Sequence, residues 1–89
     1  MVPVTIYTRD SCGYCARAIR LLQAKKVEYK EINAGYSDAL RREMAEKSGR
    51  STFPQIFIRG QHIGGCDDVY ALDAAGKLDG LLAVPKEAV

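Results

Sequence analysis

The spacing of apolar positions changes twice in the first third of the chain, and each change predicts an element. Residues 3 to 8, PVTIYT, are rich in β-branched and aromatic side chains, which predicts a short strand. From Tyr14 the apolar positions recur at helical spacing, which predicts a helix that ends near Lys25. Residues 27 to 33, VEYKEIN, alternate approximately and predict the second strand of a βαβ unit.

The middle of the chain predicts a second helix and a hairpin. Residues 37 to 48 have an apolar face at helical spacing, with Ser37 as N-cap and Gly49 as C-cap. The segments QIFI and QHIG are short strand patterns, and Arg59-Gly60 between them predicts a tight β-hairpin. A helix followed by two antiparallel strands is therefore expected here.

The last pattern predicts a helix that begins at Asp67 or Asp68 and stops at Gly76, with a short LDGLL segment behind it. The order β-α-β-α-β-β-α predicts an α/β fold with a mixed four-stranded sheet flanked by three helices. The helical crossover makes the first two strands parallel, and the hairpin adds antiparallel strands. We expect residues 1–89 to form a single domain.

Two cysteines lie between the first strand and the first helix, in the segment RDSCGYC at residues 9 to 15. Such sheets usually bind ligands at the carboxyl ends of their strands. At a helix start the thiolate of Cys12 is favoured, which predicts a pKa below the ordinary value of ~8.5. Cys15 lies on the apolar face, where burial favours the thiol. The pair is therefore predicted to be redox-active, with Cys12 attacking a disulfide and Cys15 resolving it.

Two alternatives use the same cysteines differently. His62 and Cys66 could join Cys12 and Cys15 in a Cys₃His zinc site. Alternatively, the two cysteines are incidental, His62 is a surface or core residue, and Cys66 is a small buried apolar side chain.

Charge and composition narrow the function classes. The 89 residues hold 13 Lys and Arg against 11 Asp and Glu, a net charge of +2, which does not suggest nucleic acid as the main partner. The start, MVPVTIY, does not resemble a signal peptide, and no apolar run approaches the ~18 residues of a membrane span. We expect a cytoplasmic protein without a membrane partner, and in that reducing compartment a close cysteine pair is more often catalytic or metal-binding than structural.

Three motifs together indicate a family. CGYC at residues 12–15, TFP at 52–54 and GGCDD at 64–68 follow in the order and separations of the glutaredoxins, and the chain resembles their short bacterial dithiol type over nearly its whole length. A thioredoxin would carry WCGPC, and Trp is absent. The resemblance implies a thioredoxin-like fold, glutathione as co-substrate, and the reduction of protein disulfides and glutathione mixed disulfides.

The resemblance also implies a glutathione groove. Pro54 would follow a cis peptide bond and place the Phe53 backbone beside the active cysteine, where an extended peptide can pair with it. The N–H groups of Cys66 and Asp67 would hold the γ-glutamyl carboxylate, and the Asp67 side chain would hold the ammonium. The implied groove residues are Arg9, Tyr14, Arg41, Thr52, Phe53, Pro54, Gly65, Cys66 and Asp67.

For the glycine carboxylate of glutathione, the family pattern points to Arg41 together with Arg9, because a guanidinium can donate two hydrogen bonds to a carboxylate. Arg42 is the neighbouring alternative, and a solvated helix face is the alternative for both. Asp67 and Asp68 also suit plain helix capping, which is compatible with binding.

Gly13 departs from the family pattern, because many dithiol members have Pro there. Glycine leaves the turn freer than proline does. Two hypotheses follow: the redox potential of the pair differs from that of Pro-bearing members, and the looser turn admits a [2Fe–2S] cluster held by Cys12 of two subunits and two glutathiones. The expected state is a monomer, with a dimer only around such a cluster. A variant recharged by a dedicated reductase is a further alternative.

Overall fold

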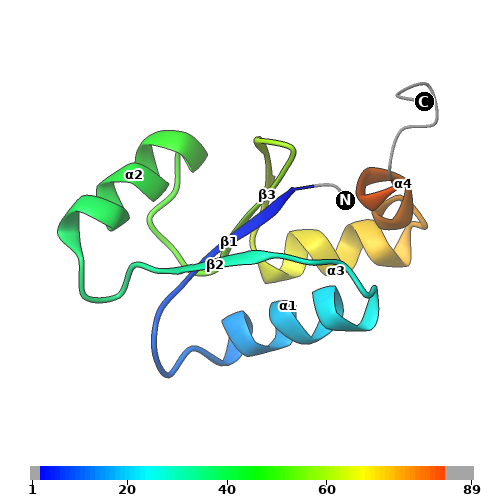
Figure 1. The fold of residues 1–89 in the computed structure, drawn as a ribbon, viewed down its shortest axis with the longest axis horizontal. Helices are drawn as coiled ribbons and strands as arrows, with labels where there is room; N and C mark the ends of the chain where they lie inside the picture. The colour runs from blue at the N-terminus through cyan, green and yellow to red at the C-terminus, as the bar shows by residue number, and fades with distance from the viewer. Residues whose placement is uncertain (1–2, 84–89) are drawn as a thin grey trace.

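A mixed four-stranded sheet in the order β2-β1-β3-β4 organises the chain. The structure, a computed structural model, describes residues 3–83 (Figure 1). Its elements are β1 (Val4–Thr8), α1 (Gly13–Ala24), β2 (Lys30–Asn33), α2 (Asp38–Ser48), β3 (Gln55–Ile58), β4 (Gln61–Gly64), α3 (Cys66–Ala74) and α4 (Leu78–Leu82).

The pairing of the strands confirms the predicted sheet. β1 runs parallel to β2 and antiparallel to β3, and β3 pairs antiparallel with β4. Tyr7, near the end of β1, is paired with Gln55 at the start of β3. The end of β1 and the beginning of β3 therefore meet at one edge of the sheet.

Alternating residues of the sheet build two cores. Ile6 and Ile56 face α1, α3 and α4 in the larger core, whereas Tyr7 and Phe57 face Met44 of α2 in the smaller one. This alternation follows from the two-residue period of a strand. In Figure 1, accordingly, α1 and α3 lie on one side of the sheet and α2 on the other. Burial of each large apolar side chain contributes roughly 1.5–3 kcal/mol, so both helix layers are held firmly.

Several predicted boundaries shift. The strand predicted over residues 27–33 is limited to Lys30–Asn33. Lys26 has a φ of 58°, and the Val27 N–H donates to the Leu22 carbonyl, so the turn that ends α1 extends to Val27. The chain therefore pairs with β1 only from Lys30 onward. The first strand begins at Val4, one residue later than predicted.

The helices also differ at their ends. α1 begins at Gly13, with Cys12 as its N-cap, and α3 begins at Cys66, with Gly65 as its N-cap, so each starts before the predicted residue. The LDGLL segment forms the short helix α4, which adds a fourth helix to the three predicted.

The turns agree with their sequence signals. Ser37 caps α2 by accepting a hydrogen bond from the Leu40 N–H, and Gly49 ends it with a φ of 73°. In the hairpin Arg59 and Gly60 have φ values of 56° and 77°, and two positive values are what a type I′ turn requires.

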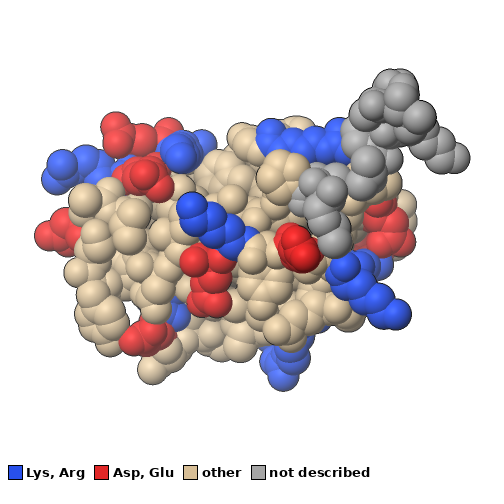
Figure 2. Space-filling view, viewed as in Figure 1, with Lys and Arg blue, Asp and Glu red and all other residues tan. Residues whose placement is uncertain are grey.

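The described surface mixes both charges. Figure 2 shows Lys and Arg interspersed with Asp and Glu on the face in view. Within residues 3–83, no helix is long and apolar enough to cross a membrane.

Candidate active site

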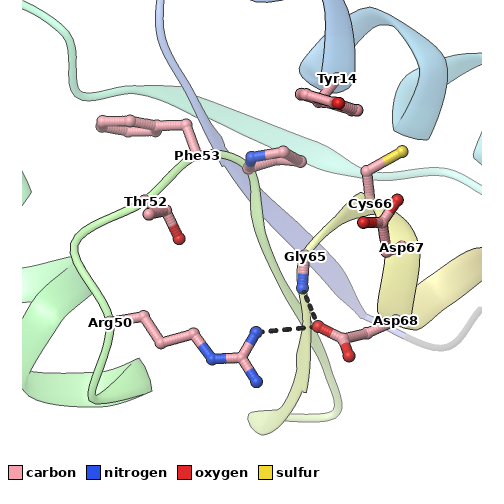
Figure 3. A pocket seen from close by; sticks show the side chains of 9 residues that line it. Tyr14, Arg50, Thr52, Phe53, Gly65, Cys66, Asp67 and Asp68 are labelled. Carbon is pink, nitrogen blue, oxygen red and sulfur yellow. Dashed lines mark hydrogen bonds and ion pairs between the residues drawn. The ribbon is translucent and has the colours of Figure 1, made fainter.

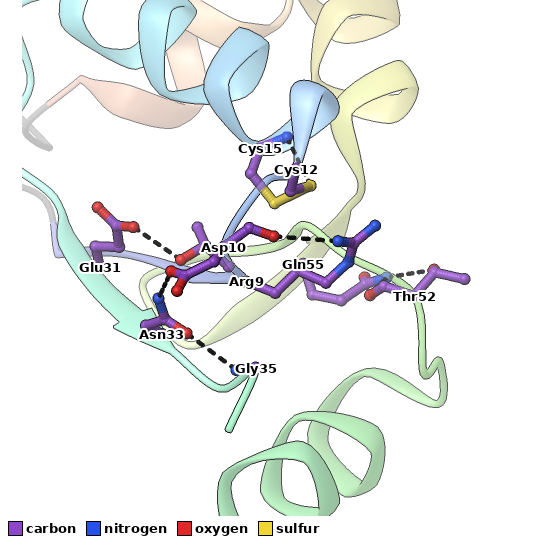
Figure 4. Close-up of a disulfide and its surroundings, with 10 residues drawn as sticks. Arg9, Asp10, Cys12, Cys15, Glu31, Asn33, Gly35, Thr52 and Gln55 are labelled. Carbon is purple, nitrogen blue, oxygen red and sulfur yellow. Dashed lines mark hydrogen bonds between the residues drawn. A yellow bond between two sulfur atoms is a disulfide. The ribbon is translucent and has the colours of Figure 1, made fainter. Parts of the chain in front are cut away.

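The cysteine pair lies where the loop after β1 enters α1. Cys12 has an extended backbone, with φ −110° and ψ 104°, and its sulfur accepts a hydrogen bond of 3.1 Å from the Cys15 N–H. The two cysteines form a disulfide, with their Cα atoms 5.2 Å apart (Figure 4). Cys15 is buried and Cys12 half-buried. The Cys12 sulfur thus occupies the position at which backbone N–H groups and the helix dipole stabilise a thiolate.

Polar side chains fasten the loop that carries Cys12. The Asp10 carboxylate accepts a hydrogen bond of 2.7 Å from the Asn33 amide, and the Asn33 carbonyl oxygen accepts one from the Gly35 N–H at 3.0 Å (Figure 4). Thr8 donates to Glu31 of β2 at 2.8 Å. The loop is therefore tied both to β2 and to the segment that leads into α2.

The segment before β3 approaches this loop from the neighbouring strand. The Phe53–Pro54 peptide bond is cis, as the resemblance implies. Two cavities meet here: one of about 190 Å³ lies toward α3, and one of about 390 Å³ lies toward α2. Thr52 and Phe53 line both cavities, so the two are neighbours across this segment, and we refer to them together as the groove.

The sequence-predicted groove residues divide between the two cavities. The cavity toward α3 is lined by Tyr14, Thr52, Phe53, Pro54, Gly65, Cys66 and Asp67, together with Arg50 and Asp68 (Figure 3). The cavity toward α2 is lined by Arg9, Arg41, Ser51, Thr52 and Phe53. A third cavity, of about 450 Å³, opens beside Cys12 and Cys15 and shares Arg9 with the second.

The start of α3 separates the roles of its two aspartates. The Asp68 carboxylate accepts hydrogen bonds of 2.8 Å from the Gly65 N–H and from the Arg50 guanidinium. These two bonds lower the pKa of Asp68. Asp67 is exposed and lines the cavity, whereas Asp68 serves as the cap. Figure 3 shows both side chains at this end of the groove.

Arg41 has a supporting role besides its place in the cavity. Its guanidinium donates to the carbonyls of Ala34 and Gly35, at 3.3 and 2.6 Å. Arg41 therefore holds the segment before α2 while it lines the groove. Arg42 is exposed on α2 and does not line either cavity of the groove.

The zinc alternative does not agree with the structure. His62 Nε2 is 2.7 Å from the Gln55 side-chain oxygen, and burial lowers the pKa of His62. Cys66 is buried, and burial raises the pKa of its thiol. Among residues 3–83, no group of three or more His, Cys, Asp or Glu side chains could hold a metal ion.

Arg50 and Gln55 lie at the site although the sequence does not predict them there. Arg50 lies four residues before Pro54, and its position at the groove depends on its ion pair with Asp68, which is distant in sequence. A basic residue shortly before TFP was the one available signal. Gln55 carried no signal, because a polar residue that begins a strand is ordinary.

Comparisons with known proteins agree with this geometry. Residues 4–63 match the family model Glutaredoxin. The chain is 56% identical over 82 residues to Glutaredoxin 3 of Escherichia coli strain K12, which covers 92% of this chain and 99% of that protein.

Two solved structures extend the comparison. The solution structure of a glutaredoxin from Brucella melitensis superposes with a TM-score of 0.82 at 61% identity, covering 92% of this chain and 89% of that one. The crystal structure of a buckwheat glutaredoxin–glutathione complex gives a TM-score of 0.84 at 33% identity, covering 91% and 76%. The four-stranded sheet with its helices is thus the thioredoxin-like fold of these structures, and the chain belongs to the glutaredoxin family.

Proposed function

We propose that Cys12 is the nucleophile and Cys15 the resolving thiol of a glutathione-dependent thiol–disulfide oxidoreductase, which is the activity of the glutaredoxin family. The observation that carries the assignment is the position of Cys12. Its sulfur is the N-cap of α1, it accepts a backbone hydrogen bond, and it is half-buried next to an open cavity, whereas Cys15 is buried behind it. A thiolate is the attacking species in disulfide exchange.

On a glutathionylated protein the reaction needs Cys12 alone. The Cys12 thiolate attacks the glutathione sulfur, the protein thiolate leaves and takes up a proton, and a Cys12–glutathione mixed disulfide forms. A second glutathione thiolate attacks the glutathione sulfur of this mixed disulfide. Glutathione disulfide is released, and Cys12 leaves as the thiolate.

On a protein disulfide both cysteines act. Cys12 attacks one sulfur of the substrate, and the released substrate thiolate takes up a proton. Cys15 loses its proton and attacks the Cys12 sulfur, so the second substrate sulfur leaves as a thiolate and takes up a proton, and the Cys12–Cys15 disulfide remains. That disulfide is the state of the pair in the structure. Two glutathiones reduce it and become glutathione disulfide.

We assign the groove to glutathione. The buckwheat relative was crystallised with glutathione, and the groove of this chain has the two charged ends that a zwitterionic tripeptide requires. Arg9 and Arg41 supply positive charge for the glycine carboxylate. The N–H groups at the start of α3 supply donors for the γ-glutamyl carboxylate, and the exposed Asp67 side chain supplies an acceptor for the ammonium.

Cluster binding stays a prediction of the sequence. Cys12 is the one thiol of the pair that is not fully buried, so a [2Fe–2S] cluster would take a single thiolate from each of two copies. A Cβ at Gly13 would have no atom within 4 Å, so the turn leaves open space beside Cys12. Anaerobic purification with glutathione, followed by cluster reconstitution, tests this directly. A brown dimer supports the prediction, and a colourless monomer contradicts it.

The remaining assignments concern the cellular setting. We propose that residues 1–89 act as one domain, as a cytoplasmic monomer, on disulfide-containing or glutathionylated proteins. Neither nucleic acid nor a membrane is required for this chemistry. Sedimentation of the reduced protein tests the monomer, because a dimer in the absence of iron and glutathione would contradict it.

The decisive experiment is the glutathione-dependent reduction of a glutathionylated peptide, coupled to glutathione reductase and NADPH. Wild type and Cys15→Ser are expected to turn over, and Cys12→Ser is expected to be inactive. Activity in Cys12→Ser would refute the nucleophile assignment. A wild type that is slow with glutathione but fast with a thioredoxin reductase system would instead favour a reductase-recharged enzyme.

A further inference from the structure

A completely buried amide lies directly behind the groove. Gln55, the first residue of β3, is 0% exposed, and Thr8 is the other buried polar residue of the described chain. Burying an amide is costly unless its groups are hydrogen-bonded. All polar atoms of the Gln55 side chain have partners, and these partners lie on both sides of it in the fold.

The partners fix the orientation of the amide. Gln55 Nε2 is 3.0 Å from the Thr52 carbonyl and 3.1 Å from the Thr52 hydroxyl oxygen. A carbonyl only accepts, so the NH₂ group of Gln55 must face Thr52. The Gln55 oxygen then faces β4, where His62 Nε2 lies 2.7 Å away and must be the donor. The His62 ring is packed against Phe57, with 5.1 Å between centroids, which holds the donor in place.

This arrangement determines what Thr52 offers to a ligand. Both oxygens of Thr52 accept from Gln55, so the hydroxyl hydrogen is free to point away from the protein interior. Thr52 is exposed and lines both cavities of the groove. Figure 3 shows its side chain at the cavity toward α3, and Figure 4 shows the hydrogen bonding between Gln55 and Thr52.

We propose that Gln55, held by His62, is a positioning residue that presents the Thr52 hydroxyl as a hydrogen-bond donor to glutathione where the two cavities meet. The inference rests on the proposed function, because it takes glutathione to be the occupant of the groove. The acceptor is a carbonyl or carboxylate oxygen of the tripeptide. Without Gln55 the Thr52 carbonyl loses its hydrogen bond, and the Thr52 hydroxyl can turn its hydrogen toward that carbonyl. The ligand then loses a fixed donor.

The test compares KM and kcat for a glutathionylated peptide among four variants and the wild type. Thr52→Val removes the hydroxyl, Thr52→Ser keeps it, Gln55→Met removes the amide at similar volume, and the fourth variant combines Thr52→Val with Gln55→Met. Gln23→Met is the matched control, because Gln23 is exposed and its amide, among the residues that the structure describes, donates to Tyr29 alone. The alkylation rate of reduced Cys12 by iodoacetamide reports whether the thiol itself is disturbed.

Loss of one neutral hydrogen bond weakens binding roughly 2- to 12-fold. We therefore expect Thr52→Val and Gln55→Met each to raise KM by a factor in that range, with kcat and the alkylation rate near wild type. The KM of the double variant is expected to be no higher than that of the single variant with the higher KM. Thr52→Ser and Gln23→Met are expected to behave as wild type. A merely structural role for Gln55 would lower kcat and alkylation as well.

Three results would overturn the inference: a wild-type KM in Gln55→Met, a wild-type KM in Thr52→Val, or effects that multiply in the double variant. If Gln55→Met does not fold, His62→Phe takes its place, since it removes the donor to Gln55 and keeps an aromatic ring. A wild-type KM in His62→Phe then overturns the link through Gln55. An inactive wild type would refute the proposed function itself, and with it the ligand assigned to Thr52.

Discussion

Replacing Gly13 with proline is expected to stabilise the protein, although glycine-to-proline changes usually destabilise. Gly13 is the first residue of α1, a position at which proline is favoured because its missing N–H has no helical partner. Cys12, the residue before it, has φ −110° and ψ 104°, an extended conformation well away from the α region that a following proline disfavours. A Cβ at Gly13 would meet no atom within 4 Å. The backbone conformation, the helix position and the space around the Cβ are therefore all compatible with proline.

The gain comes from the unfolded chain, which loses freedom at residue 13. Substitutions of this kind stabilise by roughly 0.4–1 kcal/mol. For a domain of this size that corresponds to a rise in melting temperature of about 2 to 8 °C. The gain is expected to be larger in the reduced protein, because the Cys12–Cys15 disulfide already restricts the unfolded chain around Gly13 in the oxidised one.

The assay is thermal unfolding followed by circular dichroism, with and without dithiothreitol. Gly49→Pro is the control, because Gly49 has a φ of 73° and donates its N–H to the Ala45 carbonyl at 2.8 Å, so proline there must destabilise. A melting temperature of reduced Gly13→Pro at or below that of wild type would refute the reasoning. It would mean that the Gly13 N–H or its backbone freedom is used in the folded state.

Three further predictions test the groove and its supports. Arg41→Ala is expected to raise KM for a glutathionylated peptide several-fold, whereas Arg42→Ala, its exposed neighbour, should not; equal effects in steady-state kinetics would contradict the assignment. Burial and the hydrogen bond to Glu43 raise the pKa of Tyr7 to about 12. One of the five tyrosines should therefore ionise near pH 12 in an ultraviolet titration, and the free energy of unfolding should fall as pH rises from 10 to 12. Tyr7→Phe should remove the ionisation near pH 12 and this loss of stability. The pKa of Asp68 is lowered in the folded protein, so its contribution to stability is present above the ordinary aspartate pKa and is lost as pH falls through the folded value. The free energies of unfolding of wild type and Asp68→Asn, measured in denaturant melts, should therefore converge in acid. A difference between them that does not change with pH would contradict this.

Local signals were sufficient for most elements of the fold. Ser37, Gly49 and the Arg59-Gly60 pair mark turns whose backbone conformation depends on neighbours in sequence, and the structure has them where predicted. β2 was predicted too long because Val27 and Tyr29 are apolar for another reason. They pack against the larger core although they precede the strand. Periodicity alone does not separate a paired residue from one that merely packs.

The part of the site that depends on residues close in sequence could be predicted. Cys12 and Cys15 follow from a three-residue spacing at a strand–helix junction, and the family motifs supplied the other groove residues. The places of Arg50 and Gln55 did not follow, because each is held by a partner from a different element: Asp68 of α3 for Arg50, and His62 of β4 for Gln55. Such pairs are decided by how strands and helices pack, which sequence spacing does not encode.

Two segments of the site, the cysteine loop and the cis-proline segment, are attached to the two inner strands of the sheet. The end of β1 carries the cysteine loop, and the start of β3 follows the cis-proline segment, with Tyr7 and Gln55 paired between them. The edge strands β2 and β4 can open transiently without separating these two segments, since local opening is easiest where pairing exists on one side only. Amide hydrogen exchange should therefore be slowest in β1 and β3.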